Sequence, residues 1–295
     1  MTTPPIQWYP GHIAKAEKQL KEQLKLVDVV LEVRDARIPL STEHPQLKDW
    51  LGSTKKRVLI LNRVDMIPPE IKILWSEYFT AKDQIIYFTN AQQGQGIISI
   101  QKAAQKAGID VNKKRASKGM LPRPVRAVVI GFPNVGKSAL INRLLGKRVV
   151  ESARKPGVTR QLRWVRISEE IELLDSPGII PWKLDDQLAA LKLAICEDIG
   201  DASYDNQRVA ALFIDLLKEQ DLILSKLNLR FSNAHLLRSR YEVSTEDCTG
   251  EDYLVSVANH KYKGDIERTS RQILHDFRKG NLGNLSLELP VRIDN

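Results

Sequence analysis

The segment RAVVIGFPNVGKSALINRLLG, residues 126–146, constrains the fold of this chain more than any other. An apolar stretch, AVVI, is followed by a glycine-rich turn and then by residues with helical spacing. The turn, GFPNVGKS, fits the pattern G-x4-G-K-[S/T] in the strand–turn–helix context that this pattern requires. Its glycines let main-chain N–H groups curl around phosphate oxygens, and the start of the following helix adds a favourable dipole. The segment therefore predicts a phosphate-binding loop.

Further residues for phosphate and metal follow from this loop. We expect Lys137 to reach the β- and γ-phosphates of a nucleotide and Ser138 to bind Mg²⁺. Downstream, LLDSPG places Asp175 at the end of a predicted strand, where it can hold Mg²⁺ through water, and Gly178 where its N–H can bind the γ-phosphate. Thr159 lies between these motifs, in RKPGVTR, and we expect it to close over Mg²⁺ and the γ-phosphate.

The residues that select the base precede the phosphate-binding loop. An Asp carboxylate can accept hydrogen bonds from both N1–H and the N2 amino group of guanine, whereas adenine offers no such pair of donors. The guanine signature Asn-Lys-x-Asp is matched by LNRVD, with Asn62 and Asp65 in place and Arg63 instead of Lys. We expect the aliphatic stem of Arg63 to pack along the base. FTNA, residues 88–91, predicts the loop that contacts guanine through its main chain. An ATPase is disfavoured, and nucleotide competition would separate the two.

The order of predicted elements indicates an α/β fold. Residues 28–180 alternate strand and helix, which predicts an open, mostly parallel sheet with helices on both faces. The base motif precedes the phosphate-binding loop, so this sheet is a P-loop GTPase domain only if the chain is circularly permuted. A helix is expected over residues 96–108, ending at Gly108, followed by a basic linker over residues 109–124 that joins the former termini. Residues 162–168 and 170–175 are expected to form a hairpin.

The length of 295 residues suits one large domain or two ordinary ones. Strand signals stop near residue 184, so we expect a GTPase domain over residues 1–183, with an N-terminal segment 1–27, and a helical, RNA-binding domain over residues 184–295. The segment around Gly178 leads directly into this helical domain. The presence of a γ-phosphate could therefore move that domain directly.

The charge of the chain, +9, favours a polyanionic partner. Residues 113–126 hold six basic residues and no acidic one, and residues 147–166 hold seven against Glu151 alone. Such runs are either solvated loops or nucleic-acid contacts, and two of them beside one site favour nucleic acid. The same two readings apply to basic residues on the predicted C-terminal helices: Arg238, Arg240, Lys261, Lys263, Arg268 and Arg271.

Nothing in the sequence resembles a membrane span or a targeting segment. The longest apolar runs are only as long as a strand. MTTPPIQWYPGH has neither the basic first region nor the apolar second region of a signal peptide. Cys196 and Cys248 lie outside any CxxC pattern and are expected to be thiols. We therefore expect a cytoplasmic protein without a membrane partner.

The motif order, together with WYPGHIAKA (8–16), RDARIPLS (34–41) and FRKGNLG (277–283), resembles the circularly permuted YlqF/RbgA GTPases of large-subunit assembly. The resemblance covers essentially the whole chain. It implies a Mg²⁺-dependent GTPase, which we expect to be monomeric, that binds rRNA and proteins of a 50S-type precursor in the GTP state and leaves after hydrolysis. A GTP-gated RNA-binding scaffold and a small-subunit role remain alternatives. The expected GTP contacts are Asn62, Arg63, Asp65, Asn90, Ala91, Asn134, Val135, Gly136, Lys137, Ser138, Ala139, Thr159 and Gly178.

Two further roles depend on the resemblance. Ile179 follows Gly178 where many GTPases have a Gln that orients the attacking water, and isoleucine cannot do so. His12 could hydrogen-bond this water, and the resemblance also points to it as catalytic; alternatively, it caps a helix or contacts RNA. Asn134 resembles the Asn of GTPases that bind K⁺ near the phosphates. Asp35 and Arg37 are expected to form a pair that fixes a loop.

Overall fold

The computed structural model describes residues 18, 20–22, 24–52, 55–146, 163–175, 186–199, 204–227, 229 and 231–290. The chain forms two compact units, each with its own internal contacts. In the described part, the first unit comprises residues 18–64 and 75–175, and the second comprises residues 65–74 and 186–290. None of the described helices is long and apolar enough to cross a membrane.

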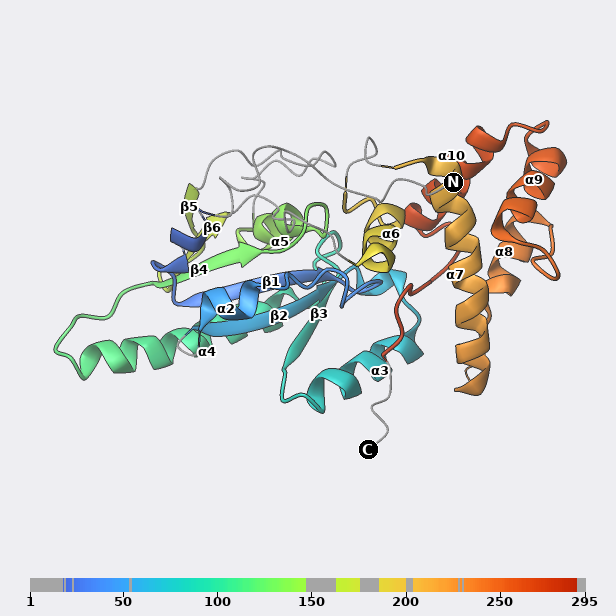
Figure 1. Ribbon diagram of the computed structural model, residues 1–295. Helices are drawn as coiled ribbons and strands as arrows, with labels where there is room; N and C mark the ends of the chain where they lie inside the picture. The colour runs from blue at the N-terminus through green and yellow to red at the C-terminus, as the bar shows by residue number, and fades with distance from the viewer. Residues whose placement is uncertain are drawn as a thin grey trace. The chain divides into compact units, whose positions relative to one another are not determined.

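The described part of the first unit is built on a six-stranded sheet in the order β3-β2-β1-β4-β6-β5 (Figure 1). Neighbouring strands are parallel except β5, which forms the expected hairpin with β6. The prediction of an open, mostly parallel sheet is thus confirmed. The strands are β1 (Val29–Asp35), β2 (Lys56–Asn62), β3 (Ile86–Thr89), β4 (Val125–Ile130), β5 (Arg163–Arg166) and β6 (Ile171–Asp175).

Helices cover both faces of this sheet. On one face, Val30 of β1 joins a buried cluster with Leu20 and Leu24 of the first described helical residues and with Leu47 of α2 (Leu47–Leu51). On the other face, α4 (Ile97–Ala116) contacts β1 to β4 and also α5 (Lys137–Leu144). All seven residues of β1 are buried, because a parallel strand between two helical layers has no solvated side.

The helix expected to end at Gly108 continues to Ala116, so the connection between α4 and β4 is shorter than the expected linker and spans residues 117–124. The sequence predicts a helix end at Gly108 because glycine is common at helix ends. Its role is different: a Cβ atom on Gly108 would lie 1.9 Å from Cγ2 of Val125. Glycine at this position lets α4 lie directly on the first residue of β4.

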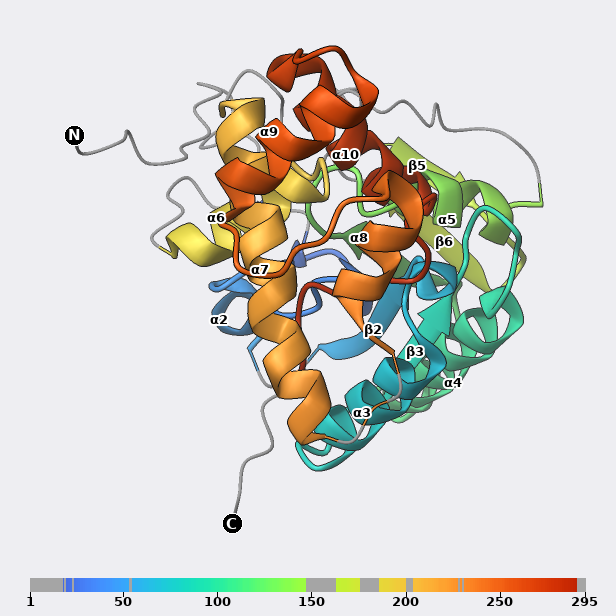
Figure 2. The same cartoon turned by 90° about the vertical axis from the view of Figure 1, so that its right-hand side faces the viewer.

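The described residues of the second unit after 186 form five helices: α6 (Gln187–Ile195), α7 (Asn206–Lys226), α8 (Asn233–Tyr241), α9 (Gly250–Lys261) and α10 (Ile266–Lys279). The long helix α7 contacts each of the other four (Figure 2). Each helix begins with a side-chain cap on its first N–H groups, from Asp186, Asp205, Ser232, Thr249 and Asp265 respectively.

The last described residues return to the segment that follows the base motif. This segment contains the 3₁₀ turn η1 (Val64–Met66) and the start of α3 (Pro69–Thr80). The N–H of Leu285 donates to the carbonyl of Met66 at 2.9 Å, and the side chain of Asn284 donates to the carbonyl of Ile67 at 3.3 Å. Residues 284–285 therefore hold the main chain directly after Asp65.

Candidate nucleotide-binding site

The predicted phosphate-binding loop connects β4 to α5 at the carboxyl end of the sheet. Its first and last glycines are required by close contacts. A Cβ on Gly131 (φ 154°) would lie 2.2 Å from the carbonyl oxygen of Val33, and a Cβ on Gly136 (φ 100°) would lie 2.1 Å from Nδ2 of Asn62. The loop is thus fitted directly against the ends of β1 and β2.

The loop side chains are arranged around the start of α5. Lys137 is buried, and its Nζ donates to the carbonyl of Phe132 at 2.7 Å, across the loop. Ser138 and Ala139 are half-buried in the first turn of α5, while the side chain of Val135 is fully buried. Val135 can therefore offer a ligand only its main chain. N–H groups at such a helix start favour an anion.

Asn62 joins three segments at this edge. Its Nδ2 donates to the carbonyl of Val135 in the phosphate-binding loop at 2.8 Å. Its Oδ1 accepts from the hydroxyl of Thr89 at 3.1 Å and from the N–H of Ala91 at 3.0 Å. The end of β2, the loop after β3 and the phosphate-binding loop are thereby held by one buried amide.

The loop after β3 is closed by its own residues and anchored by α5. Asn90 Oδ1 accepts from the N–H of Gln93 at 3.1 Å, and the N–H of Asn90 donates to Gln95. Nε of Arg143 in α5 donates to the carbonyl of Ala91 at 3.1 Å, and Nη2 donates to the next carbonyl. Sequence reasoning missed both Thr89 and Arg143. The hydroxyl of Thr89 at a strand end was a usable signal, but nothing marks Arg143 among the helical residues.

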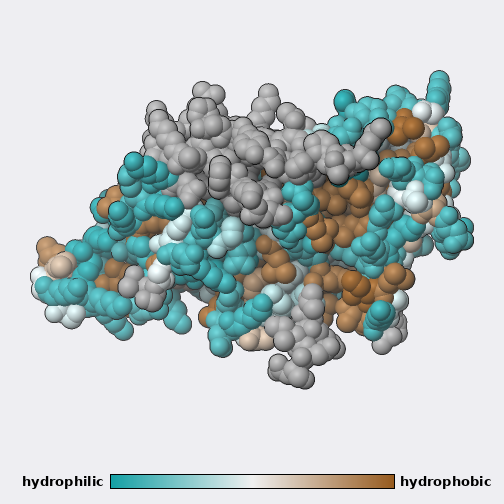
Figure 3. Space-filling model, in the orientation of Figure 1, coloured by the Kyte–Doolittle hydropathy of each residue, from teal (hydrophilic) through white to brown (hydrophobic). Residues whose placement is uncertain are grey.

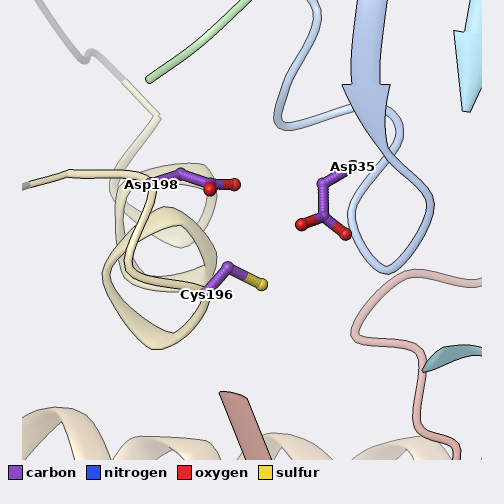
Figure 4. Close-up of side chains that lie close together, drawn as sticks. All are labelled: Asp35, Cys196 and Asp198. Atoms are coloured by element: carbon purple, nitrogen blue, oxygen red, sulfur yellow. The ribbon is translucent and has the colours of Figure 1, made fainter. Parts of the chain in front are cut away.

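The guanidinium of Arg63, whose stem is expected to pack along the base, bonds to the protein. Its guanidinium Nη2 donates to the main-chain carbonyl of Asn134 at 2.5 Å, and its Nη1 lies 3.4 Å from Oδ2 of Asp35. Asp35 ends β1 (Figure 4) and forms the expected pair with Arg37, at 2.7 Å. Burial alone would raise the pKa of Asp35, but the charges of Arg37 and Arg63 outweigh it and hold this pKa below its usual value. Asp35 is therefore an anion in the fold.

The remaining candidate residues are only partly described. Asp65 lies in η1, directly after the end of β2. Asp175 closes β6 opposite Val129 of β4, one strand from the phosphate-binding loop, and its side chain lies outside the described part. His12, Thr159 and Gly178, with Trp8, Tyr9 and Ile179, also lie outside the described residues. In the second unit, Cys196 and Asp198 follow α6 and are buried (Figure 4).

A phosphate-binding loop after β4, held by a guanine-type motif that precedes it in the chain, defines a circularly permuted P-loop GTPase. Residues 126–244 match the family model described as 50S ribosome-binding GTPase. Ribosome biogenesis GTPase A from Bacillus cereus is 36% identical over 285 residues, which is 97% of this chain and 94% of the relative. The chain belongs to this family, ribosome biogenesis GTPase A (YlqF/RbgA), and is a GTPase.

More distant relatives share the same architecture. Ribosome biogenesis GTPase A from Thermotoga maritima is 28% identical over 288 residues, 98% of this chain and 96% of the relative. The crystal structure of GNP-bound YlqF from T. maritima superimposes with a TM-score of 0.58 at 24% identity, covering 95% of this chain and all of the other. That likeness shows a shared fold across both regions of the chain.

Proposed function

We propose that this GTPase assists assembly of the large ribosomal subunit, binding the precursor in its GTP state and leaving after hydrolysis. Two relatives bear names that refer to ribosome biogenesis, and the matched family model refers to 50S ribosome binding. The observation that carries the nucleotide part is the Asn62 amide, which joins the base motif to the phosphate-binding loop. We propose that the protein performs this role as a monomer and without a membrane partner.

For guanine recognition we propose a division of roles within LNRVD. Asp65 accepts from N1–H and the N2 amino group, because its carboxylate is the acceptor pair that guanine requires. Asn62 keeps the surrounding loops in place, since its amide bonds to Val135 in the phosphate-binding loop and to Thr89 and Ala91 after β2 in the chain. Asn90 and Ala91 form the adjoining loop that faces the base.

For the phosphates we propose that Gly136, Lys137 and the first N–H groups of α5 bind the β- and γ-phosphates. Mg²⁺ fits the donor set, because Ser138 and Asp175 offer hard oxygens from neighbouring elements, one at the start of α5 and one at the end of β6. Mg²⁺ would neutralise charge on the phosphates. Thr159 and Gly178 would complete the set by closing on Mg²⁺ and the γ-phosphate.

Two proposed roles concern hydrolysis itself. His12 orients the attacking water. It takes over this role because Ile179, and not a Gln, follows Gly178. Asn134 holds K⁺ beside the β- and γ-phosphates. Support for the second comes from its position inside the loop, with φ 58° and its carbonyl fixed by Arg63. Equal turnover in K⁺ and Na⁺ would contradict the K⁺ role.

The basic residues proposed to contact rRNA differ in whether they form ion pairs within the protein. In the run after α4, Arg123 pairs with Asp28 at 2.8 Å and Arg126 with Glu172 at 3.6 Å, so both serve the fold. Figure 3 shows mostly hydrophilic residues over α4. Leu121, which lies in the connection after α4, is 84% exposed. The exposed lysines of this region are Lys102, Lys106, Lys113, Lys114 and Lys118.

Some of the described basic residues of the helical unit also form ion pairs within the protein, and others do not. Arg240, Lys261 and Arg271 pair with carboxylates at 2.7 to 2.8 Å. Within the described residues, Arg238, Lys263 and Arg268 are exposed and make no such ion pair. We propose these three as the rRNA contacts of the helical unit, and their replacement by Gln should reduce the salt dependence of RNA binding.

The decisive experiment measures GTP turnover by the wild type and by His12→Ala, with and without large ribosomal subunits, in K⁺ buffer. We expect subunits to accelerate the wild type many-fold, and the variant to bind GTP without responding. If subunits change neither protein, hydrolysis on the large subunit is not the function, and a GTP-gated scaffold or a small-subunit role takes its place. If His12→Ala loses GTP binding and turnover together, the N-terminal segment is structural.

A further inference from the structure

The buried carboxylate of Asp35 ends β1, opposite Asn62 at the end of β2. Oδ1 of Asp35 accepts from the N–H and Nε of Arg37, at 2.9 and 3.0 Å, and Oδ2 accepts from Nη2 of Arg37 at 2.7 Å. The side chains of both residues are fully buried. A carboxylate bonded at both oxygens to a planar guanidinium cannot rotate freely. Asp35 is therefore an anchor of fixed position at the carboxyl end of β1.

A second guanidinium connects this anchor to the phosphate-binding loop. One nitrogen of Arg63, Nη1, lies 3.4 Å from Oδ2 of Asp35, while Nη2 lies 2.5 Å from the carbonyl oxygen of Asn134. The guanidinium is rigid and planar, so the position of one nitrogen determines that of the other. A lysine ammonium is a single charged point and does not offer this two-ended geometry.

The main chain on both sides of the contact adopts the left-handed conformation, with φ 65° at Arg63 and φ 58° at Asn134. Such conformations are uncommon for residues other than glycine and persist where the surroundings hold them. The hydrogen bond joins these two residues directly. It therefore helps to maintain the conformation of the loop that wraps the phosphates.

We propose that Asp35 is a positioning residue for the phosphate-binding loop and that it acts through Arg63. The proposal rests on the proposed role of this loop in binding GTP and GDP. Asp35 orients the guanidinium of Arg63, and this guanidinium holds the carbonyl of Asn134. Arg63 and Asp35 are thus a matched pair, and the Arg in the place of the usual Lys has a structural reason.

The test measures the dissociation rate of a fluorescent GDP analogue from the wild type, Asp35→Asn, Arg63→Met and the double variant. We expect each single variant to release GDP about tenfold faster, since one hydrogen bond to a charged group is lost or misdirected. The double variant should be no faster than Arg63→Met, because Asp35 acts through Arg63. If Asp35→Asn accelerates release equally in the Arg63→Met background, the two residues act independently and the proposal is wrong.

Asp35→Asn also weakens the pairing of buried Arg37, so Arg63→Lys provides a second route that leaves the Asp35–Arg37 pair intact. It should release GDP several-fold faster at unchanged charge; release at the wild-type rate would overturn the proposal. Asp28→Asn is the matched control. Asp28 precedes the other end of β1 and pairs with Arg123 at 2.8 and 3.0 Å.

Asp28→Asn should lower the melting temperature without changing the GDP dissociation rate. If it accelerates release as much as Asp35→Asn does, the effect is general loosening of β1 and the proposal fails. Failure of the proposed function looks different. A wild type that does not bind the GDP analogue, or binds it no better than Lys137→Ala, would contradict the nucleotide site itself, whereas tight wild-type binding with unaltered variants contradicts only the role of Asp35.

Discussion

The side-chain amide of Asn62 donates a hydrogen bond to the main-chain carbonyl of Val135 across 2.8 Å. This bond joins the residue that opens the base motif to the middle of the phosphate-binding loop. The two residues are far apart in the sequence but meet because β2 and β4 both end at the same edge of a parallel sheet. One buried side chain therefore holds the base motif and the phosphate-binding loop together.

Replacement of Asn62 by Ala should weaken GDP binding by about tenfold or more. Three hydrogen bonds are lost, to Val135, Thr89 and Ala91, and each buried group left unpaired costs about 1–3 kcal/mol. Isothermal titration with GDP measures the effect. Asn112→Ala is the control, because Asn112 also uses both ends of its amide, on Arg123. It should lower stability and leave GDP affinity unchanged.

Replacement of Gly108 by Ala should destabilise the first unit by about 1–3 kcal/mol, the usual cost of overpacking. The added methyl group would meet Cγ2 of Val125 at 1.9 Å, inside the contact between α4 and β4. Denaturant unfolding measures the loss. The double variant with Val125→Ala removes the clashing group and should recover part of the stability. If Gly108→Ala were as stable as the wild type, α4 would not be held this close to the strand.

Replacement of Asp65 by Asn should change the base preference. An amide in the place of the carboxylate offers a donor where guanine also presents donors, so affinity for GDP should fall by about a hundredfold. Xanthine carries a carbonyl oxygen in the place of the guanine amino group and can accept from that donor. Competition of GDP, XDP and ADP against a fluorescent nucleotide measures this. Unchanged GDP affinity would contradict the assignment of Asp65 as the base reader.

The helical unit should lose stability in acid through Asp276. Burial raises the pKa of this carboxyl, but hydrogen bonds from Arg240, Asn281 and Tyr241 outweigh burial and lower the pKa below its ordinary 3.8. A lowered folded-state pKa gives stability that is present above pH 3.8 and is lost as the pH falls through the folded value. Asp276→Asn should therefore be about 2 kcal/mol less stable at neutral pH.

The difference in unfolding free energy between the wild type and Asp276→Asn should shrink below about pH 4. Urea unfolding followed at several pH values measures it. Glu246→Gln removes an exposed acid in the same unit and should follow the wild type throughout. A constant difference down to pH 2 would mean that the charge of Asp276 contributes nothing.

The sheet, its permuted strand order and the phosphate-binding loop could be predicted because local pattern determines them. Buried parallel strands carry apolar runs, such as VLIL in β2 and AVVI in β4, and GFPNVGKS carries its own turn and helix start. The end of α4 could not be predicted, because a glycine inside a helix and one at its end look alike in a sequence. Only the position of Val125 across the helix–strand contact distinguishes them.

In the candidate site, too, the sequence predicts the local motifs but not the contacts between them. The residues of LNRVD and GFPNVGKS are recognisable one motif at a time, but their mutual contacts are not. That Arg63 bonds to Asn134, or that Arg143 holds the loop at Ala91, depends on side chains reaching between elements that are distant in sequence. Such contacts follow from the completed fold and have no periodic pattern that a sequence could display.

The permuted strand order also sets the sequence of events during the protein's own synthesis. β1, β2 and β3 are adjacent in the sheet and emerge first, so half of the sheet can form before the phosphate-binding loop has been translated. The hydrogen bonds from Asn62 to Val135 and from Arg63 to Asn134 can form only after β4 is inserted beside β1. The nascent chain therefore completes the strand that ends in the base motif early, and the phosphate-binding loop joins that strand only when β4 is inserted.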